Sequence, residues 1–305
     1  MGEMNHKVVM ITGATNGIGK AAAEELARRG ATVIVVGRNR RRAESTAAAI
    51  QKQVANAAVE WMAADFTSLE QVRRLAEEFR ARHHQLHVLL NNAGLWWRRR
   101  HVTTDGFEAT FAVNHLAHFL LTNLLLDVLK ASAPARVVNV SSDAHRRGRM
   151  DFQDLMAEKR YSGLQCYSNS KLANILFTKE LARRLEGTGV TANSLHPGLV
   201  ATGLFTNVGS VLGLLLQLAR PWMLRPEQGA RTSVYAASAP EMEYVSGRYF
   251  DNCRENIPAP AAQDEAAARR LWQISAELTG LREKASDGKQ PADSNTARVG
   301  RGSGA

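Results

Sequence analysis

Two residues with reactive side chains, Tyr167 and Lys171, lie four positions apart in the segment Tyr-Ser-Asn-Ser-Lys. On a helix, residues at this spacing share a face, so one surface presents a phenol and an ammonium group together. A free phenol has a pKa near ~10 and exchanges protons poorly at neutral pH, but a nearby cation lowers that pKa. The pair is therefore suited to pass a proton to or from a reacting oxygen, as in carbonyl reduction or alcohol oxidation.

A glycine-rich turn at residues 12–19, Thr-Gly-Ala-Thr-Asn-Gly-Ile-Gly, offers a place for the pyrophosphate of a dinucleotide. Gly13 permits a tight turn, whereas Gly17 and Gly19 let the backbone approach the phosphate and the helix approach the sheet. The alternative is a tight turn without a ligand. The candidate pyrophosphate-binding residues are Gly13, Thr15, Asn16, Gly17, Ile18 and Gly19.

The end of the second predicted strand indicates which nicotinamide nucleotide binds. A carboxylate there would bond the ribose 2′-hydroxyl of NAD, but this strand runs into Val-Val-Gly-Arg-Asn-Arg at residues 35–40 and carries no acid. Arg38 suits a 2′-phosphate through charge-assisted hydrogen bonds, so we expect NADP(H) rather than NAD(H). The alternative is that Arg38 only begins a solvated helix.

Two further strand ends supply candidate cofactor contacts. Asp65 follows the third strand and either bonds the adenine amino group or caps a helix together with Ser68. Asn92, Ala93 and Gly94 follow the fourth strand, at the edge of an open α/β sheet where ligands bind.

Short apolar runs alternate with helical patterns along most of the chain. This alternation predicts an α/β fold with βαβ units and a doubly wound parallel sheet of the Rossmann type. Strands are expected at residues 7–12, 32–36, 58–62, 88–91, 136–140, 190–195 and 248–250, and helices at 17–29, 40–55, 69–82, 105–129, 164–185 and 262–279.

Composition limits the class of protein. The 305 residues include 45% hydrophobic residues, enough for one large core, and two cysteines, which do not make a disulfide framework. We expect a single domain over residues 1–282, a disordered tail over 283–305, and a cytoplasmic protein without signal peptide or membrane span. The formal charge of +10 is interpreted as a solvated basic surface, because no nucleic-acid-binding motif accompanies it. We therefore expect no nucleic-acid partner.

Taken together, the motifs resemble those of the short-chain dehydrogenase/reductase superfamily of the Tyr-x-x-x-Lys type, over about residues 7 to 280. Besides the glycine turn and the Tyr-Lys pair, the matching pieces are Asn-Asn-Ala-Gly at 91–94, Asn114, Ser-Ser at 141–142, and Pro197 with Gly198. The resemblance implies that Tyr167 is the general acid or base, that Lys171 lowers its pKa and bonds the nicotinamide ribose, and that Ser142 orients the substrate oxygen. It also implies that Asn114 holds a water connecting Lys171 to solvent, and that Pro197 and Gly198 contact the cofactor. Asn114 as an ordinary buried amide remains the alternative.

Longer segments are similar to the retinol dehydrogenase-like branch, which handles lipophilic aldehydes, ketones or alcohols with NADP(H). These segments lie at 113–121, 170–185 and 196–198, and residues 145–163 are expected to form a loop beside the active site. The alternatives are the same chemistry on a small polar carbonyl compound, or a dinucleotide-binding regulator without turnover.

The apolar stretch at 203–225 lies where this family carries a substrate lid. It is expected to be that lid, with a peripheral membrane contact or a subunit contact as alternatives. Trp96 and Trp97 either line the substrate pocket or anchor a loop. The family commonly forms homo-oligomers through its long helices, so one is possible here.

Nine histidines do not make a metal site in this reading, because the group His83, His84 and His87 has no nearby cysteine or paired carboxylates. His115 and His118 are expected to pack or cap, and His196 to orient the loop that follows it.

Overall fold

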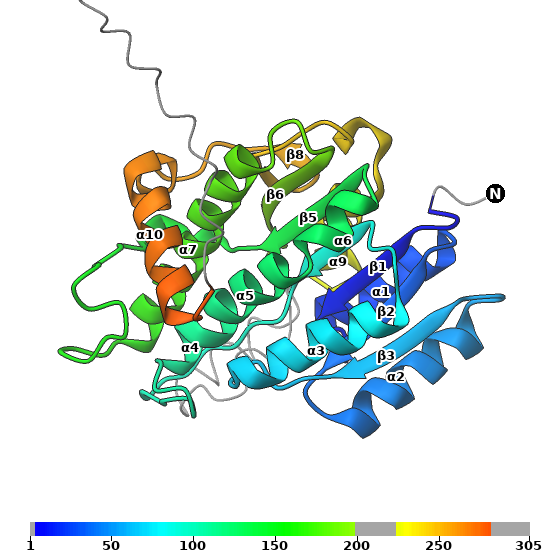
Figure 1. The fold of residues 1–305 in the computed structure, drawn as a ribbon, viewed down its shortest axis with the longest axis horizontal. Helices are drawn as coiled ribbons and strands as arrows, with labels where there is room; N and C mark the ends of the chain where they lie inside the picture. Colours follow the sequence, from blue (N-terminus) through cyan, green and yellow to red (C-terminus); the bar gives the residue numbers. More distant parts are fainter. Residues whose placement is uncertain (1–3, 199–223, 282–305) are drawn as a thin grey trace, which may run out of the picture.

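The computed structural model describes residues 4–198 and 224–281, which build one sheet with helices on both faces (Figure 1). The strands lie in the order β3-β2-β1-β4-β5-β6-β7-β8, and all neighbours are parallel except β7 and β8. Their bounds are β1 Val8–Thr12, β2 Thr32–Gly37, β3 Val59–Ala63, β4 Val88–Asn91, β5 Ala135–Val140, β6 Val190–His196, β7 Tyr249–Asp251 and β8 Arg254–Glu255. The predicted α/β fold with a doubly wound parallel sheet is confirmed.

The order in which the chain adds strands to the sheet reverses between β1 and β4, and this reversal creates the binding edge. From β1 the chain moves outward to β2 and β3, then returns to β4 on the other side of β1. Because these strands are parallel, the residues that follow β1, β2, β4, β5 and β6 all lie at one edge of the sheet. Ligands of open α/β sheets bind at such a reversal.

Two helical layers cover the sheet. The buried residues of α1, α2 and α9 pack on one face, and those of α3, α5 and α7 on the other. The strands are buried on both faces, which explains their almost continuous apolar runs. The bounds are α1 Gly17–Arg28, α2 Arg40–Gln53, α3 Leu69–Arg82, α5 Ala117–Leu124, α7 Gly163–Arg184 and α9 Pro226–Ser238.

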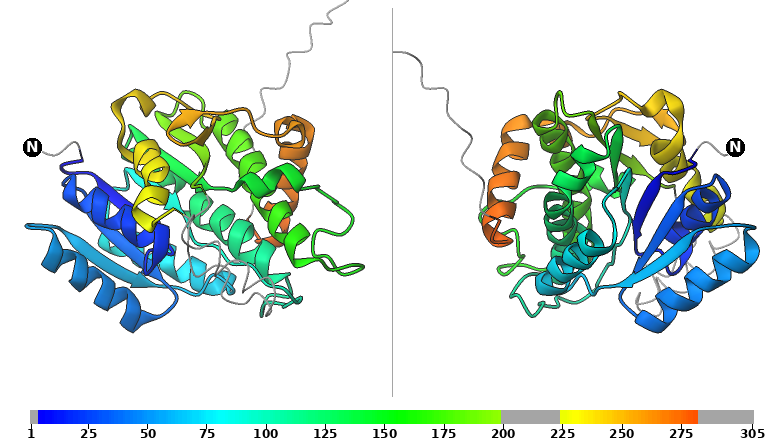
Figure 2. Two further views of the ribbon diagram at one scale, coloured as in Figure 1. Left: turned by 180° about the vertical axis from the view of Figure 1, so that it is seen from behind. Right: turned by 45° about the vertical axis from the view of Figure 1, so that its right-hand side comes forward.

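A further helix, α10 (Glu265–Leu278), lies outside α7 and forms an outer layer, drawn in orange in Figure 2. Trp272 of α10 packs against Phe119 and Phe177, with ring centroids 4.9 and 5.8 Å apart. His115 Nε2 lies 2.9 Å from the hydroxyl of Ser275, and both residues are fully buried. The apolar outer side of α5 and α7 is therefore covered by the chain's own C-terminal helix.

The long helix predicted at 105–129 is interrupted. It begins at Ala109 behind the N-cap Glu108, whose carboxylate accepts hydrogen bonds from the backbone N–H groups of Thr110 and Phe111. A π-helical turn follows the short first piece, and the backbone at Leu125 leaves helical geometry. The pieces are α4 Ala109–Phe111, η1 Ala112–Leu116, α5, and α6 Leu126–Ala131.

Some elements lie outside the sequence-based expectation. Helix α9 and the strand β8 were not predicted, because the pattern around them is short and broken by Gly and Pro. Three 3-10 turns complete the described elements: η2 Asp143–Arg147, η5 Pro240–Met242 and η6 Pro260–Gln263. Within residues 4–198 and 224–281, no helix has the length and apolar character needed to cross a membrane. The expected lid at 203–225 and the tail at 283–305 lie outside the described residues, apart from positions 224 and 225.

Candidate active site

A cleft of about 990 Å³ opens along the carboxyl edge of the strands. It runs from the loop after β2 to the loop after β6, and its wall includes the first turns of α1 and α7. Almost all of the predicted site residues line this one cleft: Gly13, Thr15, Asn16, Gly17, Ile18, Gly19, Arg38, Asp65, Asn92, Ala93, Gly94, Ser142, Tyr167, Lys171, Pro197 and Gly198. The exception is Asn114, which is fully buried behind the wall.

The glycine turn between β1 and α1 is packed too tightly for side chains. Gly13 has φ +65°, and a Cβ at this position would lie 2.8 Å from the Cα of Ala93. A Cβ at Gly19 would lie 2.4 Å from Nδ2 of Asn92. The turn therefore brings the N-terminus of α1 against the loop after β4, and the unpaired N–H groups of that helix end suit a phosphate.

Thr12, which sequence reasoning did not select, holds this arrangement together. Its hydroxyl oxygen accepts hydrogen bonds from the backbone N–H groups of Asn92 and Ala93, both at 2.9 Å, and lies 3.0 Å from Nε2 of His118. The fully buried threonine thus joins β1, the loop after β4 and α5. The sequence signal for this role is a threonine directly before the first glycine of the turn.

The adenosine end of the cleft carries the predicted arginine. Arg38 is exposed and lines the cleft directly after β2, together with Arg42 from the first turn of α2. Asp65 also lines the cleft, but its Oδ1 already accepts from the backbone N–H and the hydroxyl of Thr67. The N-cap of α3 is Ser68 alone, because the Ser68 hydroxyl accepts from the N–H of Gln71.

Tyr167 projects from the first turns of α7 and is 9% exposed. Burial raises the pKa of Tyr167 to about 12, and a hydrogen bond with the Ser142 side chain acts in the opposite direction. The phenol therefore holds its proton at neutral pH and makes contact with the serine predicted to share its task.

Lys171 lies one turn further along α7, with its Nζ donating to the carbonyl oxygen of Val140 at 3.0 Å. Burial lowers the pKa of Lys171 to about 8. The expected lowering of the tyrosine pKa by Lys171 is not seen here: the ammonium lies 5.6 Å from the centre of the Tyr167 ring, and burial and Ser142 set the pKa of the phenol. The physical reason is that both groups are buried, and burial disfavours the charged form of each.

The two serines after β5 differ in role. The hydroxyl of Ser141 is buried and donates to the carbonyl oxygen of Lys171 at 2.7 Å. The hydroxyl oxygen of Ser142 faces the cleft and accepts from the N–H of Ala144 at 3.2 Å, so its proton stays available. This geometry supports the choice of Ser142.

Asn114 lies in the π-helical turn η1 and anchors the loop after β4. Its Oδ1 accepts from the N–H of Leu95 at 2.8 Å, and its Nδ2 donates to the Leu95 carbonyl and to the Ser170 hydroxyl. The backbone carbonyl oxygen of Asn114 lies 3.1 Å from Nδ1 of His118. Burial lowers the pKa of His118 to about 3, so the ring is neutral and donates one hydrogen here. The side-chain amide is thus satisfied by protein groups, as in the buried-amide alternative.

His115 packs in the core as expected, whereas the contact of His196 is with the turn after β5 and not with the loop that follows it. His115 packs among Phe111, Phe119 and Phe177, and burial lowers its pKa to about 3. His196 lies at the end of β6, where its Nδ1 accepts from the N–H of Asp143 at 3.3 Å. Trp96 and Trp97 line the cleft, although Trp97 also packs on His101.

Comparisons with known proteins show to which family the chain is similar. The family model described as short chain dehydrogenase matches residues 7–212. Retinol dehydrogenase 12 of Homo sapiens is 49% identical over 276 residues, covering 90% of this chain and 87% of the relative. A solved structure of an uncharacterised protein from Mycobacterium Paratuberculosis is 37% identical with a TM-score of 0.74, covering 90% of this chain and 94% of that one. A candidate NAD(P) dependent gluconate 5-dehydrogenase from Beutenbergia cavernae, solved with bound NADP, is 27% identical with a TM-score of 0.67, covering 81% and 95%.

Proposed function

Since the chain belongs to the short-chain dehydrogenase family, in its retinol dehydrogenase-like branch, we propose that it transfers hydride between NADP(H) and a lipophilic carbonyl or alcohol compound. The coarser statement, an oxidoreductase acting on alcohol or carbonyl groups, follows from the family itself. The observation that carries the proposal is that a single cleft holds the glycine turn at one end and Tyr167, Ser142 and Lys171 at the other.

The cleft residues fit a dinucleotide. The crowded glycine turn and the N-terminus of α1 would hold the pyrophosphate, and Lys171 would reach the nicotinamide ribose. Arg38 and Arg42 provide two guanidinium groups for a 2′-phosphate, which supports NADP(H) over NAD(H). When bound, the nicotinamide supplies or accepts the hydride.

The side chains of this protein manage the proton and the developing charge. In carbonyl reduction, negative charge grows on the substrate oxygen, and Ser142 and Tyr167 both donate hydrogen bonds to it. Because burial keeps Tyr167 protonated, the phenol is ready to give up its proton to that oxygen. In alcohol oxidation the same groups act in reverse, and the phenolate form of Tyr167 accepts the proton.

The substrate end of the cleft supports an apolar substrate. Trp96, Trp97 and Leu164 line it, and Leu164 is 53% exposed although it is a large apolar side chain. The names of the relatives point the same way, since several are retinol dehydrogenases.

Two further expectations stay predictions. Peripheral membrane contact rests on the apolar stretch at 203–225, which lies almost entirely outside the described residues. A homo-oligomer is proposed only through surfaces other than the outer side of α7, because α10 covers that side.

The function is tested by following NADPH and NADH consumption with a series of aldehydes and ketones graded by chain length. We expect NADPH to be preferred and kcat/KM to rise with chain length. Tyr167→Phe is expected to lower kcat about 10²- to 10⁴-fold while the affinity for NADPH is kept. Undiminished turnover in Tyr167→Phe would refute the assigned acid, and a preference for short polar carbonyl compounds would refute the lipophilic substrate.

A further inference from the structure

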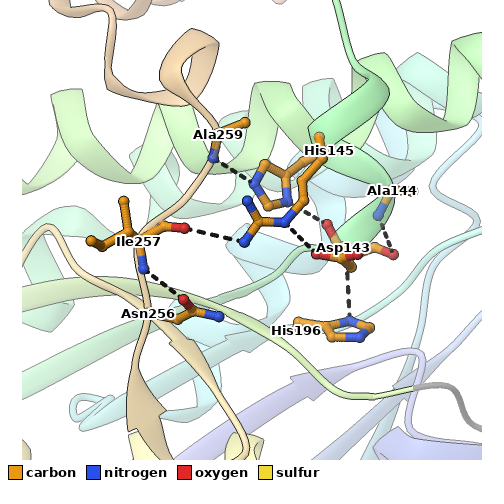
Figure 3. A network of polar contacts seen from close by, with 9 residues as sticks. Asp143, Ala144, His145, His196, Asn256, Ile257 and Ala259 are labelled. Atoms are coloured by element: carbon orange, nitrogen blue, oxygen red, sulfur yellow. Dashed lines mark hydrogen bonds and ion pairs between the residues drawn. The ribbon is translucent and has the colours of Figure 1, made fainter.

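His145 lies in the turn η2, three residues after Ser142, and is fully buried (Figure 3). It does not line the cleft, and the reaction as described above does not use it. Its imidazole instead lies between the turn and the segment 256–259, which leads from β8 to η6.

Both ring nitrogens of His145 have partners. Nδ1 lies 2.7 Å from the carbonyl oxygen of Ser142, and because a carbonyl can only accept, Nδ1 carries the hydrogen. Nε2 accepts from the backbone N–H of Ala259 at 3.0 Å, so it carries no hydrogen. Both bonds together require the neutral ring, and burial lowers the pKa of His145 in agreement with this.

Other contacts reinforce the same connection. The ring of His145 meets that of Tyr249 edge to face, with centroids 5.0 Å apart. Arg146 bonds Asp143 at 2.7 Å and the carbonyl oxygen of Ile257 at 3.2 Å. On its other side the turn is held by His196, as described above.

These bonds act on the backbone that carries the Ser142 hydroxyl. The carbonyl oxygen of Ser142 accepts from both the backbone N–H and the Nδ1 of His145, at 3.0 and 2.7 Å. The peptide plane after Ser142 is therefore fixed, and with it the direction in which its side chain meets Tyr167. A displacement of about 1 Å in such a group can cost on the order of 10²-fold in rate.

We propose that His145 is a positioning residue, which acts through the backbone of Ser142 by tying it to Ala259, 114 residues away in the sequence. The proposal rests on the proposed function, because the effect is measured as turnover. A residue that only stabilised the fold would lower activity whether or not the Ser142 hydroxyl were present.

The two bonds are separated by two substitutions of the same residue. In His145→Asn, the amide nitrogen takes the place of Nδ1 and keeps the bond to Ser142. In His145→Gln, the longer side chain places an oxygen near the position of Nε2, keeps the acceptor for Ala259 and loses the donor to Ser142. We expect kcat for carbonyl reduction to fall about 10- to 100-fold in His145→Gln, which loses the bond to Ser142 itself, and about 3- to 10-fold in His145→Asn, which loses only the bond to Ala259, with the KM for NADPH changed less than about 2-fold in both.

The decisive measurement repeats His145→Gln in a Ser142→Ala background. We expect less than about a 2-fold further loss of kcat there, because the group being positioned is gone. An equal loss in both backgrounds, or unchanged kcat in His145→Gln alone, overturns the proposal. Absence of turnover in the unmodified chain with every carbonyl compound refutes the proposed function instead.

If His145→Gln does not fold, His145→Asn replaces it in both backgrounds. It keeps the donor to the Ser142 carbonyl oxygen and loses the acceptor for the Ala259 N–H. We expect a loss of kcat about 3- to 10-fold that disappears in the Ser142→Ala background. Persistence of the loss in that background overturns the proposal.

Discussion

At the scale of single residues, the neighbours Ser141 and Ser142 show how two adjacent hydroxyl groups take different roles because they point in opposite directions. Successive side chains of an extended segment point to opposite sides. The Ser141 hydroxyl donates to the carbonyl oxygen of Lys171, and the Ser142 hydroxyl contacts Tyr167 in the cleft.

Replacing each serine by alanine should therefore have opposite consequences. Ser142→Ala is expected to lower kcat about 10²-fold with little change in thermal stability, because it removes one donor to the developing oxyanion. Ser141→Ala is expected to lower the free energy of unfolding by about 1 kcal/mol and kcat by less than about 3-fold. Steady-state kinetics and thermal denaturation of both variants check this, and the reverse pattern would assign the reaction to Ser141.

Lys171 makes stability depend on pH in a definite direction. Its folded pKa of about 8 lies below the ordinary value of 10.5, so the unfolded chain binds more protons between these values. The contribution of Lys171 to stability therefore rises as pH increases from about 8 to 10.5, and is lost on acidification through the folded pKa.

Lys171→Met should remove this dependence. We expect the free energy of unfolding of Lys171→Met, relative to the native chain, to decrease by about 1–3 kcal/mol between pH 7.5 and 10.5. Chemical denaturation across this range measures it, with the exposed Lys130→Met as the control that should show no such trend. A flat difference for Lys171→Met would mean that burial does not disfavour its charge.

The sequence was most informative where chemistry is local. The glycine turn and the Tyr167–Lys171 spacing each depend on neighbours within eight positions, so their types alone indicate a function. Contacts such as Thr12 with His118, or His145 with Ala259, join residues 106 and 114 positions apart, and no local pattern reveals them. The pKa of Tyr167 also escaped prediction, because it depends on burial rather than on spacing.

At the scale of elements, the order of strands and helices follows from the apolar pattern, whereas the interruption of the predicted helix at 105–129 does not. The π-helical turn η1 places Asn114 toward the loop after β4, and Glu108 fixes the beginning of this helix. The Glu108 carboxylate is buried and accepts hydrogen bonds from two backbone N–H groups.

Glu108→Ala should therefore be unusually costly for an N-cap. We expect a loss of about 2–3 kcal/mol in the free energy of unfolding, since two buried donors are left without partners. Ser162→Ala removes the N-cap of α7, which is exposed and bonds Gln165 N–H at 3.4 Å, and should cost about 0.5–1 kcal/mol. Denaturation of both variants tests the difference, and equal losses would show that burial of the cap is not what matters.

At the scale of the whole molecule, the cleft spans the sheet from the end of β2 to the end of β6, so a bound dinucleotide would contact loops from both halves. A ligand that binds only the folded state stabilises the entire domain by mass action. We expect NADPH at a hundred times its Kd to add about 2.7 kcal/mol to the free energy of unfolding and to raise Tm accordingly.

Arg38→Ser should separate the two nucleotides in the same measurement. It is expected to reduce the NADPH-induced shift in Tm to about the size seen with NADH, and to leave the NADH shift unchanged, because only the 2′-phosphate loses a charge-assisted contact. Differential scanning fluorimetry over a range of nucleotide concentrations checks this. An equal reduction for both nucleotides would place Arg38 outside 2′-phosphate recognition.

Helix α10 closes over α7 with Trp272, while the guanidinium of Arg184 lies 4.3 Å from that ring. Helix α10 thus keeps the apolar outer side of α5 and α7 out of water. A premature stop codon before position 265 would spare every described residue that lines the cleft. Such a truncated protein should be recovered from cells as an insoluble or rapidly degraded product. A mutation far from the reacting groups would then lower the amount of the protein rather than its kcat.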